Sequence, residues 1–284
     1  MTTVLVDDDV QLAGFRMAVR RAPGPRRPFL LVHGLSSNAR LWDGVARRLA
    51  DAGHEVVAVD LRGHGRSEAP TDGYDTATAA ADLADLVREL GWVGDREPVV
   101  AGQSWGGNVV LTMAAGYDDV AAIALVDGGW LHLSDRFPTF EACWDQLAPP
   151  AFDDWTRAEL VERARSWNSD WPEEGRLGTL ANFAELPDGT VRPHLSRAHH
   201  RSIVHSLWAD DPRPLYAQIA VPTLLMAAVD AVPASPTPVT DALERIPGAE
   251  VSWYVGAHHD LHAQQPDRCA AELLALAGRV DGPV

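Results

Sequence analysis

The stretch PVVAGQSWGG, residues 98–107, carries the strongest indication of the fold in this chain of 284 residues. Its first half is a short apolar run that predicts a buried strand, and the apolar residues 106–116 that follow predict a helix. Between them stands a Gly-x-Ser-x-Gly pattern in which Ser104 lies between Gly102 and Gly106. A side chain at either glycine would collide with the strand or the helix, so the pattern predicts a sharp turn that exposes the serine hydroxyl.

Further short apolar runs alternate with helical patterns on both sides of this stretch. Near-continuous apolar runs, typical of strands buried on both faces, occupy residues 28–32, 55–59, 120–126, 222–226 and 251–255. Amphipathic periodicity predicts helices at residues 41–52, 76–90 and 266–276. Residues 11–20 alternate in polarity and predict an antiparallel edge strand, whereas the acidic run 7–9 predicts a solvated turn. The alternation as a whole predicts an α/β protein with a mostly parallel sheet flanked by helices.

One long segment interrupts this alternation. Residues 128–220 contain no clear buried strand, only amphipathic pieces separated by prolines, and six of the ten tryptophans of the chain fall within it. A segment of this length inside an α/β chain predicts an inserted helical cap rather than a loop. We expect a core domain of residues 1–128 and 218–284, and a cap of residues 129–217.

Composition narrows the chemistry and the partners. The 24 basic residues are all arginine, against 40 Asp and Glu, and the formal net charge is −16. The lack of lysine excludes a Schiff-base lysine and the lysine of a phosphate-binding loop, and the acidity disfavours nucleic acid and membrane surfaces as partners. The acidic start of the sequence predicts a soluble, cytoplasmic protein. Cys143 and Cys269 stand in no metal-ligand or redox spacing, so we expect no metal and no other cofactor.

A histidine near the end of the chain is the candidate partner of Ser104. A serine hydroxyl is a weak nucleophile at neutral pH and needs a base, which is itself oriented by a carboxylate. Residues 256–262, GAHHDLH, follow the last predicted strand and precede the last predicted helix. A histidine in such a loop can reach the tip of the central strand.

With these segments in place, the chain resembles the α/β-hydrolase family along almost its whole length. The segments that carry the resemblance are HGLS at 33–36, DLRGHGRS at 60–67, GQSWGG at 102–107 and GAHHDL at 256–261. The resemblance implies an α/β-hydrolase fold with an eight-stranded sheet, in which Ser104 is the nucleophile and His259 the general base. It also implies that the backbone N–H groups of Leu35 and Trp105 form the oxyanion hole.

The resemblance leaves two candidates for the acid of the triad. In most members the acid follows the strand after the cap, three residues beyond a small residue. Counted from Ala228, this position falls on Ala231, with Asp230 one residue early. In a minority, including some haloalkane dehalogenases, the acid ends the strand after the nucleophile helix, where Asp127 stands. We favour Asp127, because its register needs no shift, and keep Asp230 as the alternative.

The resemblance implies a serine hydrolase that cleaves a carboxylic ester or lactone of a small hydrophobic molecule through an acyl-enzyme intermediate. Serine at position 104 argues against haloalkane dehalogenase and epoxide hydrolase chemistry, which needs an aspartate nucleophile. Carbon–carbon bond hydrolases, cofactor-free perhydrolases similar to haloperoxidases, and receptor-like ligand-binding relatives stay open as alternatives. Trp105, next to the nucleophile, and Trp130, three residues after Asp127, are the predicted lining of an apolar substrate pocket.

Overall fold

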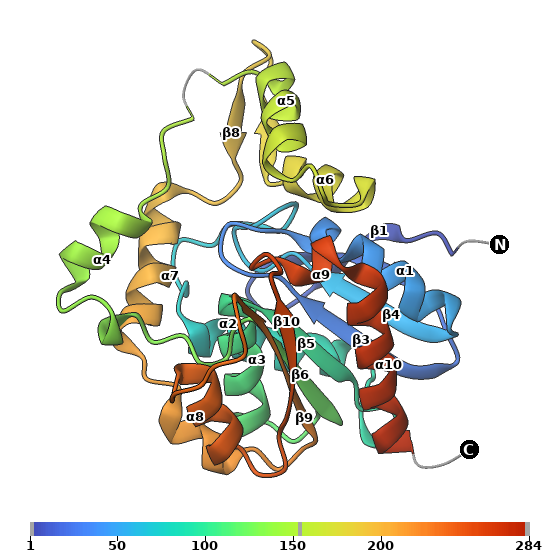
Figure 1. Ribbon diagram of the computed structural model, residues 1–284. Helices are drawn as coiled ribbons and strands as arrows, with labels where there is room; N and C mark the ends of the chain where they lie inside the picture. Colours follow the sequence, from blue (N-terminus) through green and yellow to red (C-terminus); the bar gives the residue numbers. More distant parts are fainter. Residues whose placement is uncertain (1–2, 153–154, 282–284) are drawn as a thin grey trace.

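An eight-stranded sheet runs through the computed structural model, which describes residues 3–152 and 155–281 (Figure 1). The ends of the predicted core domain, residues 1–2 and 282–284, lie outside this description. In spatial order the strands are β1 (Val6–Gln11), β2 (Arg16–Ala22), β4 (His54–Val59), β3 (Arg26–Val32), β5 (Val99–Gln103), β6 (Ala122–Val126), β9 (Thr223–Val229) and β10 (Glu250–Val255). The six strands from β4 to β10 are parallel, and β1 and β2 are antiparallel. All six strands predicted from apolar runs are present, and the predicted fold class is confirmed.

Helices cover both faces of the sheet. Side chains alternate along each strand, so a strand of apolar residues presents an apolar surface on each face that must be buried. In β3, Leu30 and Val32 pack into one hydrophobic core, and Phe29 and Leu31 pack into the other. The helices are α2 (Thr76–Glu89), α3 (Trp105–Gly116) and α8 (Pro238–Arg245) on the first face, and α1 (Asp43–Asp51), α9 (Leu261–Gln264) and α10 (Pro266–Asp281) on the second. Within the described ranges, no helix is both long enough and apolar enough to cross a bilayer.

The N-terminal strands differ from the prediction. Residues 11–20 do not form one edge strand: they span the end of β1, a turn at 12–15 and most of β2. The acidic run 7–9 lies in β1, not in a turn, and β1 is the edge of the sheet. Cross-strand ion pairs explain this: Asp7 pairs with Arg20, Asp8 with Arg21 at 3.3 Å, and Asp9 with Arg16 at 2.7 Å.

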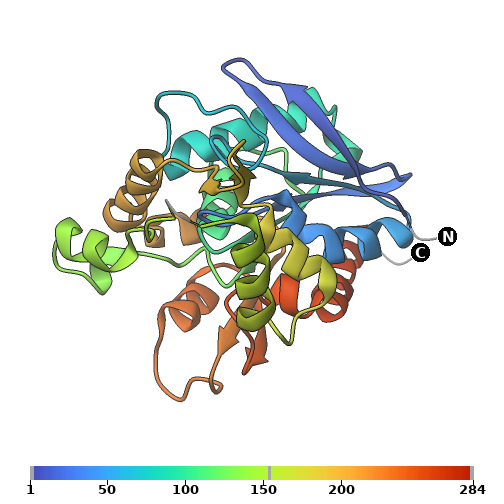
Figure 2. The same ribbon diagram turned by 90° about the horizontal axis from the view of Figure 1, so that it is seen from above.

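A long insertion lies between β6 and β9. Its elements are α4 (Phe140–Leu147), α5 (Arg157–Trp167), α6 (Glu173–Leu180), β7 (Phe183–Glu185), β8 (Val191–Pro193) and α7 (Arg197–Ala209). Besides its helices the insertion contains a short hairpin that was not predicted: β7 and β8 pair antiparallel around a turn in which Gly189 has φ of 82°. Figure 1 shows α5, α6 and β8 above the sheet and α4 and α7 beside it, and Figure 2 shows the β1–β2 hairpin along one edge.

Candidate active site

Ser104 lies on a sharp turn between β5 and α3. Its φ is 54° and its ψ is −122°, a strained conformation for a residue that is not glycine. A Cβ built at Gly102 would overlap the carbonyl of Gly106, and one built at Gly106 would overlap the carbonyl of His33. Both glycines are therefore required by close backbone packing, as the sequence pattern predicted.

Asp127 and His259 are joined by a short hydrogen bond. Asp127 follows β6 with φ of 45°, and His259 lies in the loop between β10 and α9. The His259 Nδ1–H donates to Asp127 Oδ2 over 2.6 Å, and the backbone N–H of Ala228 donates to Asp127 Oδ1 over 3.0 Å. The carboxylate is thus held from two sides, and it fixes the imidazole with Nε2 unprotonated.

Asp230 stands apart from this pair. It is exposed and follows directly after Val229, the last residue of β9. Among the residues that the structure describes, no hydrogen bond or ion pair joins Asp230 to His259. Of the two candidate acids, the geometry brings only Asp127 to the histidine.

The nucleophile turn packs directly against the loops that carry the acid and the histidine. The Ser104 N–H donates to Val126 O over 2.9 Å, and a Cβ at Gly128 would overlap the Ser104 carbonyl oxygen. Gln103 Nε2 donates to His259 O over 3.3 Å, which ties the histidine loop to the strand that ends at the serine. Within the described chain no hydrogen bond joins the serine hydroxyl to His259; in substrate-free enzymes this bond is often long and tightens in the complex.

The predicted oxyanion loop, residues 33–36, lies against the same serine. A Cβ at Gly34 would come within 2.9 Å of Ser104 Cβ, so only glycine allows this approach. In the described contacts neither the Leu35 N–H nor the Trp105 N–H donates a hydrogen bond. The Trp105 N–H belongs to the first turn of α3, where backbone donors have no partner within the helix. Neither of these two N–H groups is thus occupied by another described residue.

Two buried histidines hold this loop in place. The N–H of Leu61 donates to His33 Nε2 over 3.0 Å, and the N–H of Ser36 donates to His64 Nε2 over 3.2 Å. Each Nε2 is thus an acceptor, so each Nδ1 carries the proton, which goes to Gly34 O from His33 and to Arg62 O from His64. Burial lowers the pKa of His33 to about 4 and that of His64 well below its usual range, so both stay neutral.

The loop that carries His64 is anchored to α2 by a buried ion pair. Arg62 Nε and Nη2 donate to the two carboxylate oxygens of Asp82 over 2.7 and 2.6 Å. Each residue is only 8% exposed. A bidentate pair of this kind fixes the loop direction, and either partner alone would leave a buried charge.

The insertion contacts the histidine loop through Gln264. Its Oε1 accepts the His258 N–H over 2.7 Å, and its Nε2 donates to Asp170 Oδ2 over 2.5 Å. The ring of Trp171 lies edge-on to that of His258, with the centroids 5.1 Å apart. The position of the insertion is therefore coupled to the loop that holds His259.

The protonation of His259 reflects two opposing effects. Burial disfavours the imidazolium, but the hydrogen bond to Asp127 and the charge of that carboxylate outweigh it, so the pKa of His259 is raised. A base with a raised pKa accepts a proton more readily in the reaction, provided that the pH keeps it neutral beforehand.

The two predicted pocket tryptophans do not line the large cavity near this site. Trp105 is 0% exposed: its Nε1 donates to Thr76 Oγ1 over 3.2 Å, and its ring stacks on His64. Trp130 is half-buried against the main core. The prediction for Trp105 was wrong because the first residue of α3 points its side chain into the core, not along the turn.

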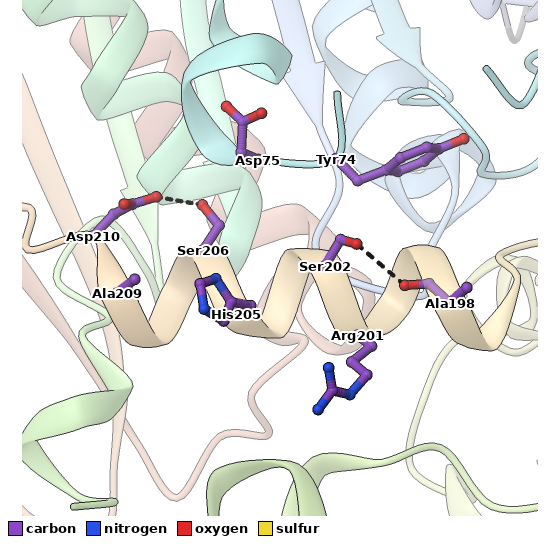
Figure 3. Close-up of a pocket in the computed structure, with 9 residues that line it drawn as sticks. All are labelled: Tyr74, Asp75, Ala198, Arg201, Ser202, His205, Ser206, Ala209 and Asp210. Atoms are coloured by element: carbon purple, nitrogen blue, oxygen red, sulfur yellow. Dashed lines mark hydrogen bonds between the residues drawn. The ribbon is translucent and has the colours of Figure 1, made fainter. Parts of the chain in front are cut away.

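Two of the cavities that border the insertion adjoin α7. One, of about 1370 Å³, is bordered by the oxyanion loop, α5, α7 and the β7–β8 hairpin, and its aromatic lining is Phe152, Trp155 and Phe183. The other, of about 510 Å³, lies between α7 and residues 74–75 (Figure 3). In Figure 3 the Ser202 hydroxyl donates to Ala198 O within α7, and the Ser206 hydroxyl donates to Oδ2 of Asp210, which follows the helix. In the described part of the chain, no group of three or more His, Cys, Asp or Glu side chains is placed to hold a metal.

A family model described as alpha/beta hydrolase fold matches residues 27–171, half of the chain. The chain therefore belongs to the α/β-hydrolase family, and it is an enzyme. A soluble epoxide hydrolase from Corynebacterium sp. (strain C12) is 35% identical over 143 residues, 49% of this chain and 48% of that protein, so the chain spans about half of its length. A non-heme haloperoxidase from Rhodococcus erythropolis is 28% identical over 264 residues, 89% of this chain and 93% of that protein.

Solved structures share the whole fold at low sequence identity. The structure of E-2-(acetamidomethylene)succinate hydrolase has a TM-score of 0.79 and 24% identity, and the match covers 98% of this chain and 100% of that one. An esterase from Exiguobacterium antarcticum has a TM-score of 0.71 and 19% identity, with coverage of 99% and 100%. At these identities the similarity establishes the fold alone.

Proposed function

We propose that this enzyme is a serine hydrolase that cleaves a carboxylic ester or lactone of a small, largely apolar molecule. Ser104 is the nucleophile, His259 the general base and Asp127 the acid. The observation that carries the proposal is the 2.6 Å hydrogen bond between His259 and Asp127, placed beside a serine that is held at φ 54° on a strand-to-helix turn. The segment 129–217 acts as the cap over this site.

The reaction follows from the roles of these groups. His259 Nε2 takes the proton of Ser104 as its Oγ attacks the carbonyl carbon, and the N–H groups of Leu35 and Trp105 bind the resulting oxyanion. The intermediate collapses to an acyl-serine, and the leaving alcohol takes the proton from His259. Water then attacks the acyl group with His259 again as base, and Ser104 is released with the acid product. Asp127 stabilises the imidazolium in both steps.

Residue 104 also separates this proposal from epoxide opening. Epoxide opening through an alkyl-enzyme ester needs a carboxylate as the nucleophile. This chain is similar to an epoxide hydrolase but has serine at position 104. Serine favours acyl transfer instead.

The test is active-site labelling combined with ester hydrolysis. We expect a fluorophosphonate to label the protein at Ser104, and p-nitrophenyl butyrate to be hydrolysed. Ser104→Ala should abolish labelling and lower kcat by about 10⁴-fold or more. Ser202→Ala, on α7, is the matched control and should change neither. Turnover and labelling that persist in Ser104→Ala would refute the assignment.

A second candidate rests on the haloperoxidase similarity, which covers 89% of this chain. In this case hydrogen peroxide replaces water as the attacking group on the acyl-serine and yields a peracid. Bromide oxidation that requires both peroxide and a carboxylic acid, and that is lost in Ser104→Ala, would establish this activity.

A further inference from the structure

The large cavity begins where the oxyanion loop ends. Ser36 and Ser37, which follow the proposed oxyanion donor Leu35, both border it. The Ser36 hydroxyl lies 2.8 Å from His200 Nδ1, and His200 Nε2 donates to Leu147 O over 3.1 Å. The loop and the insertion are thus joined at the cavity wall. Gly34, two residues before Ser36, packs against Ser104, so the cavity begins within a few residues of the nucleophile.

Among the residues that the structure describes, the charged side chains that line the cavity are all positive. Three arginines, Arg163, Arg192 and Arg197, line it, and no Asp or Glu does so among the lining residues that the structure describes. Burial lowers the pKa of the lining residues His194 and His200, so these imidazoles are neutral near pH 7. In a chain of net charge −16, such a lining is unusual. The hollow in Figure 3 has mixed charge instead, because carboxylates as well as an arginine line it.

Arg192 and Arg197 form no ion pair with any carboxylate in the part of the chain that the structure describes. Most of the 24 arginines form an ion pair with a described carboxylate. Neither Arg192, on β8, nor Arg197, at the start of α7, forms one. Arg197 is nevertheless oriented: its Nη1 donates to Pro149 O over 2.6 Å, and its Cζ lies 5.2 Å from the ring centroid of Trp144. Its charge is held in place, and no described carboxylate neutralises it.

Apolar side chains and a buried hydroxyl also line the cavity. The apolar side chains include Phe152, Phe183 and Leu195. Ser37 is 8% exposed, and its Oγ has no hydrogen-bond partner among the described residues. A buried hydroxyl without a partner is costly, so a ligand oxygen or a bound water is expected beside it.

We propose that the cavity binds the remote end of the substrate, and that this end is an apolar chain or ring that terminates in a carboxylate. Arg192 and Arg197 supply the positive charge that attracts the carboxylate, and the aromatic and aliphatic lining holds the chain between it and Ser104. This proposal rests on the proposed ester hydrolysis and specifies its substrate class. A guanidinium without a counter-charge gains a charge-assisted hydrogen bond from a carboxylate, whereas a neutral substrate of the same length gains none.

The test compares two esters that differ by one charge. Mono-p-nitrophenyl adipate carries a free carboxylate, and p-nitrophenyl methyl adipate has the same chain with that carboxylate esterified. We expect the wild-type enzyme to hydrolyse the first with a kcat/KM about tenfold higher, mainly through KM. The ratio should fall in about 0.5 M NaCl, because part of the attraction is screened. In the double variant Arg192→Gln/Arg197→Gln the ratio should approach one, and the control Arg165→Gln, on the exposed side of α5, should keep the wild-type ratio.

The outcomes separate this proposal from the one on which it rests. Hydrolysis of the neutral ester with an equal or higher kcat/KM in the wild-type enzyme overturns the carboxylate assignment and leaves the serine hydrolase intact. A preference that survives in the double variant also overturns it. Failure to hydrolyse either ester, together with no fluorophosphonate labelling, refutes the hydrolase itself. The wild-type comparison and its salt dependence do not depend on the folding of any variant.

Discussion

Replacement of Asp127 by asparagine probes the contact on which the candidate site depends. The wild-type carboxylate accepts two hydrogen bonds, from His259 Nδ1–H over 2.6 Å and from the Ala228 N–H over 3.0 Å. Asparagine has nearly the same shape, so the Ala228 bond survives on its amide oxygen. The amide NH₂ then faces His259 Nδ1, which must become an acceptor and leave the proton on Nε2. An imidazole in this tautomer cannot take the proton of Ser104.

The size of the effect follows from this change of tautomer. The loss combines the wrong tautomer with the loss of the charge that stabilises the imidazolium, and for such a substitution kcat falls by about 10⁴. At 1.36 kcal/mol for each factor of ten, this is about 5.4 kcal/mol of transition-state stabilisation. The fold should tolerate the change, because Asp127 is 19% exposed at its side chain and its backbone bond to Met226 O is unaffected.

The assay is the initial rate of p-nitrophenyl butyrate hydrolysis under saturating conditions, with circular dichroism as the check on folding. Asp230→Asn is the matched control: the residue is exposed and has no contact with His259 in the described structure, so its kcat should stay within about twofold of the wild-type value. A kcat for Asp127→Asn within tenfold of wild type, or a loss in Asp230→Asn instead, would refute the assignment of the acid.

Three further perturbations test the surroundings of this pair. The pKa of His259 is raised above 6.5, and the base must be neutral to act, so kcat/KM should rise with pH through a midpoint above 6.5. A midpoint below pH 6.5 would contradict the interaction with Asp127. Gly128→Ala should lower the free energy of unfolding by about 1–3 kcal/mol and abolish fluorophosphonate labelling, because the new Cβ overlaps the backbone of Ser104. The control is Gly116→Ala, which has open space at its Cβ and should leave the melting temperature unchanged. Asp82→Ala should lower the free energy of unfolding, measured with urea, by about 3–5 kcal/mol, because it leaves the buried Arg62 without its counter-charge. A loss below about 1 kcal/mol would contradict the buried ion pair.

The parts of the fold that were predicted from sequence are those in which one local pattern suffices. Strand β3 is buried on both faces, so its apolar run is continuous and unambiguous. Strand β1 was missed because aspartates lie on both of its faces, and they are neutralised by arginines of β2 that only the folded sheet brings near them. The β7–β8 hairpin was missed because strands of three residues have too few positions for a period to be recognised.

The candidate site likewise has residues that local sequence motifs predict and residues that only the fold brings together. Ser104 and His259 follow from local motifs, because the turn and the loop around them are each built from consecutive residues. The arginine lining of the cavity has no such signal. Arg192 and Arg197 lie on different elements, and only the fold determines which of the described carboxylates lie near them. The misplacement of Trp105 has the same origin, since sequence adjacency to Ser104 does not determine the direction of its side chain.

The position of the acid shows why sequence order alone leaves two candidates. Strands β6 and β9 are neighbours in the sheet, with Val126 paired to Met226, so acids that follow either strand begin from the same edge. The positive φ of Asp127 turns its carboxylate toward β9, where the Ala228 N–H holds it. A carboxylate that enters from β6 thus occupies the space beside His259. A second acid after β9 has no role there, which is consistent with the exposure of Asp230 to solvent.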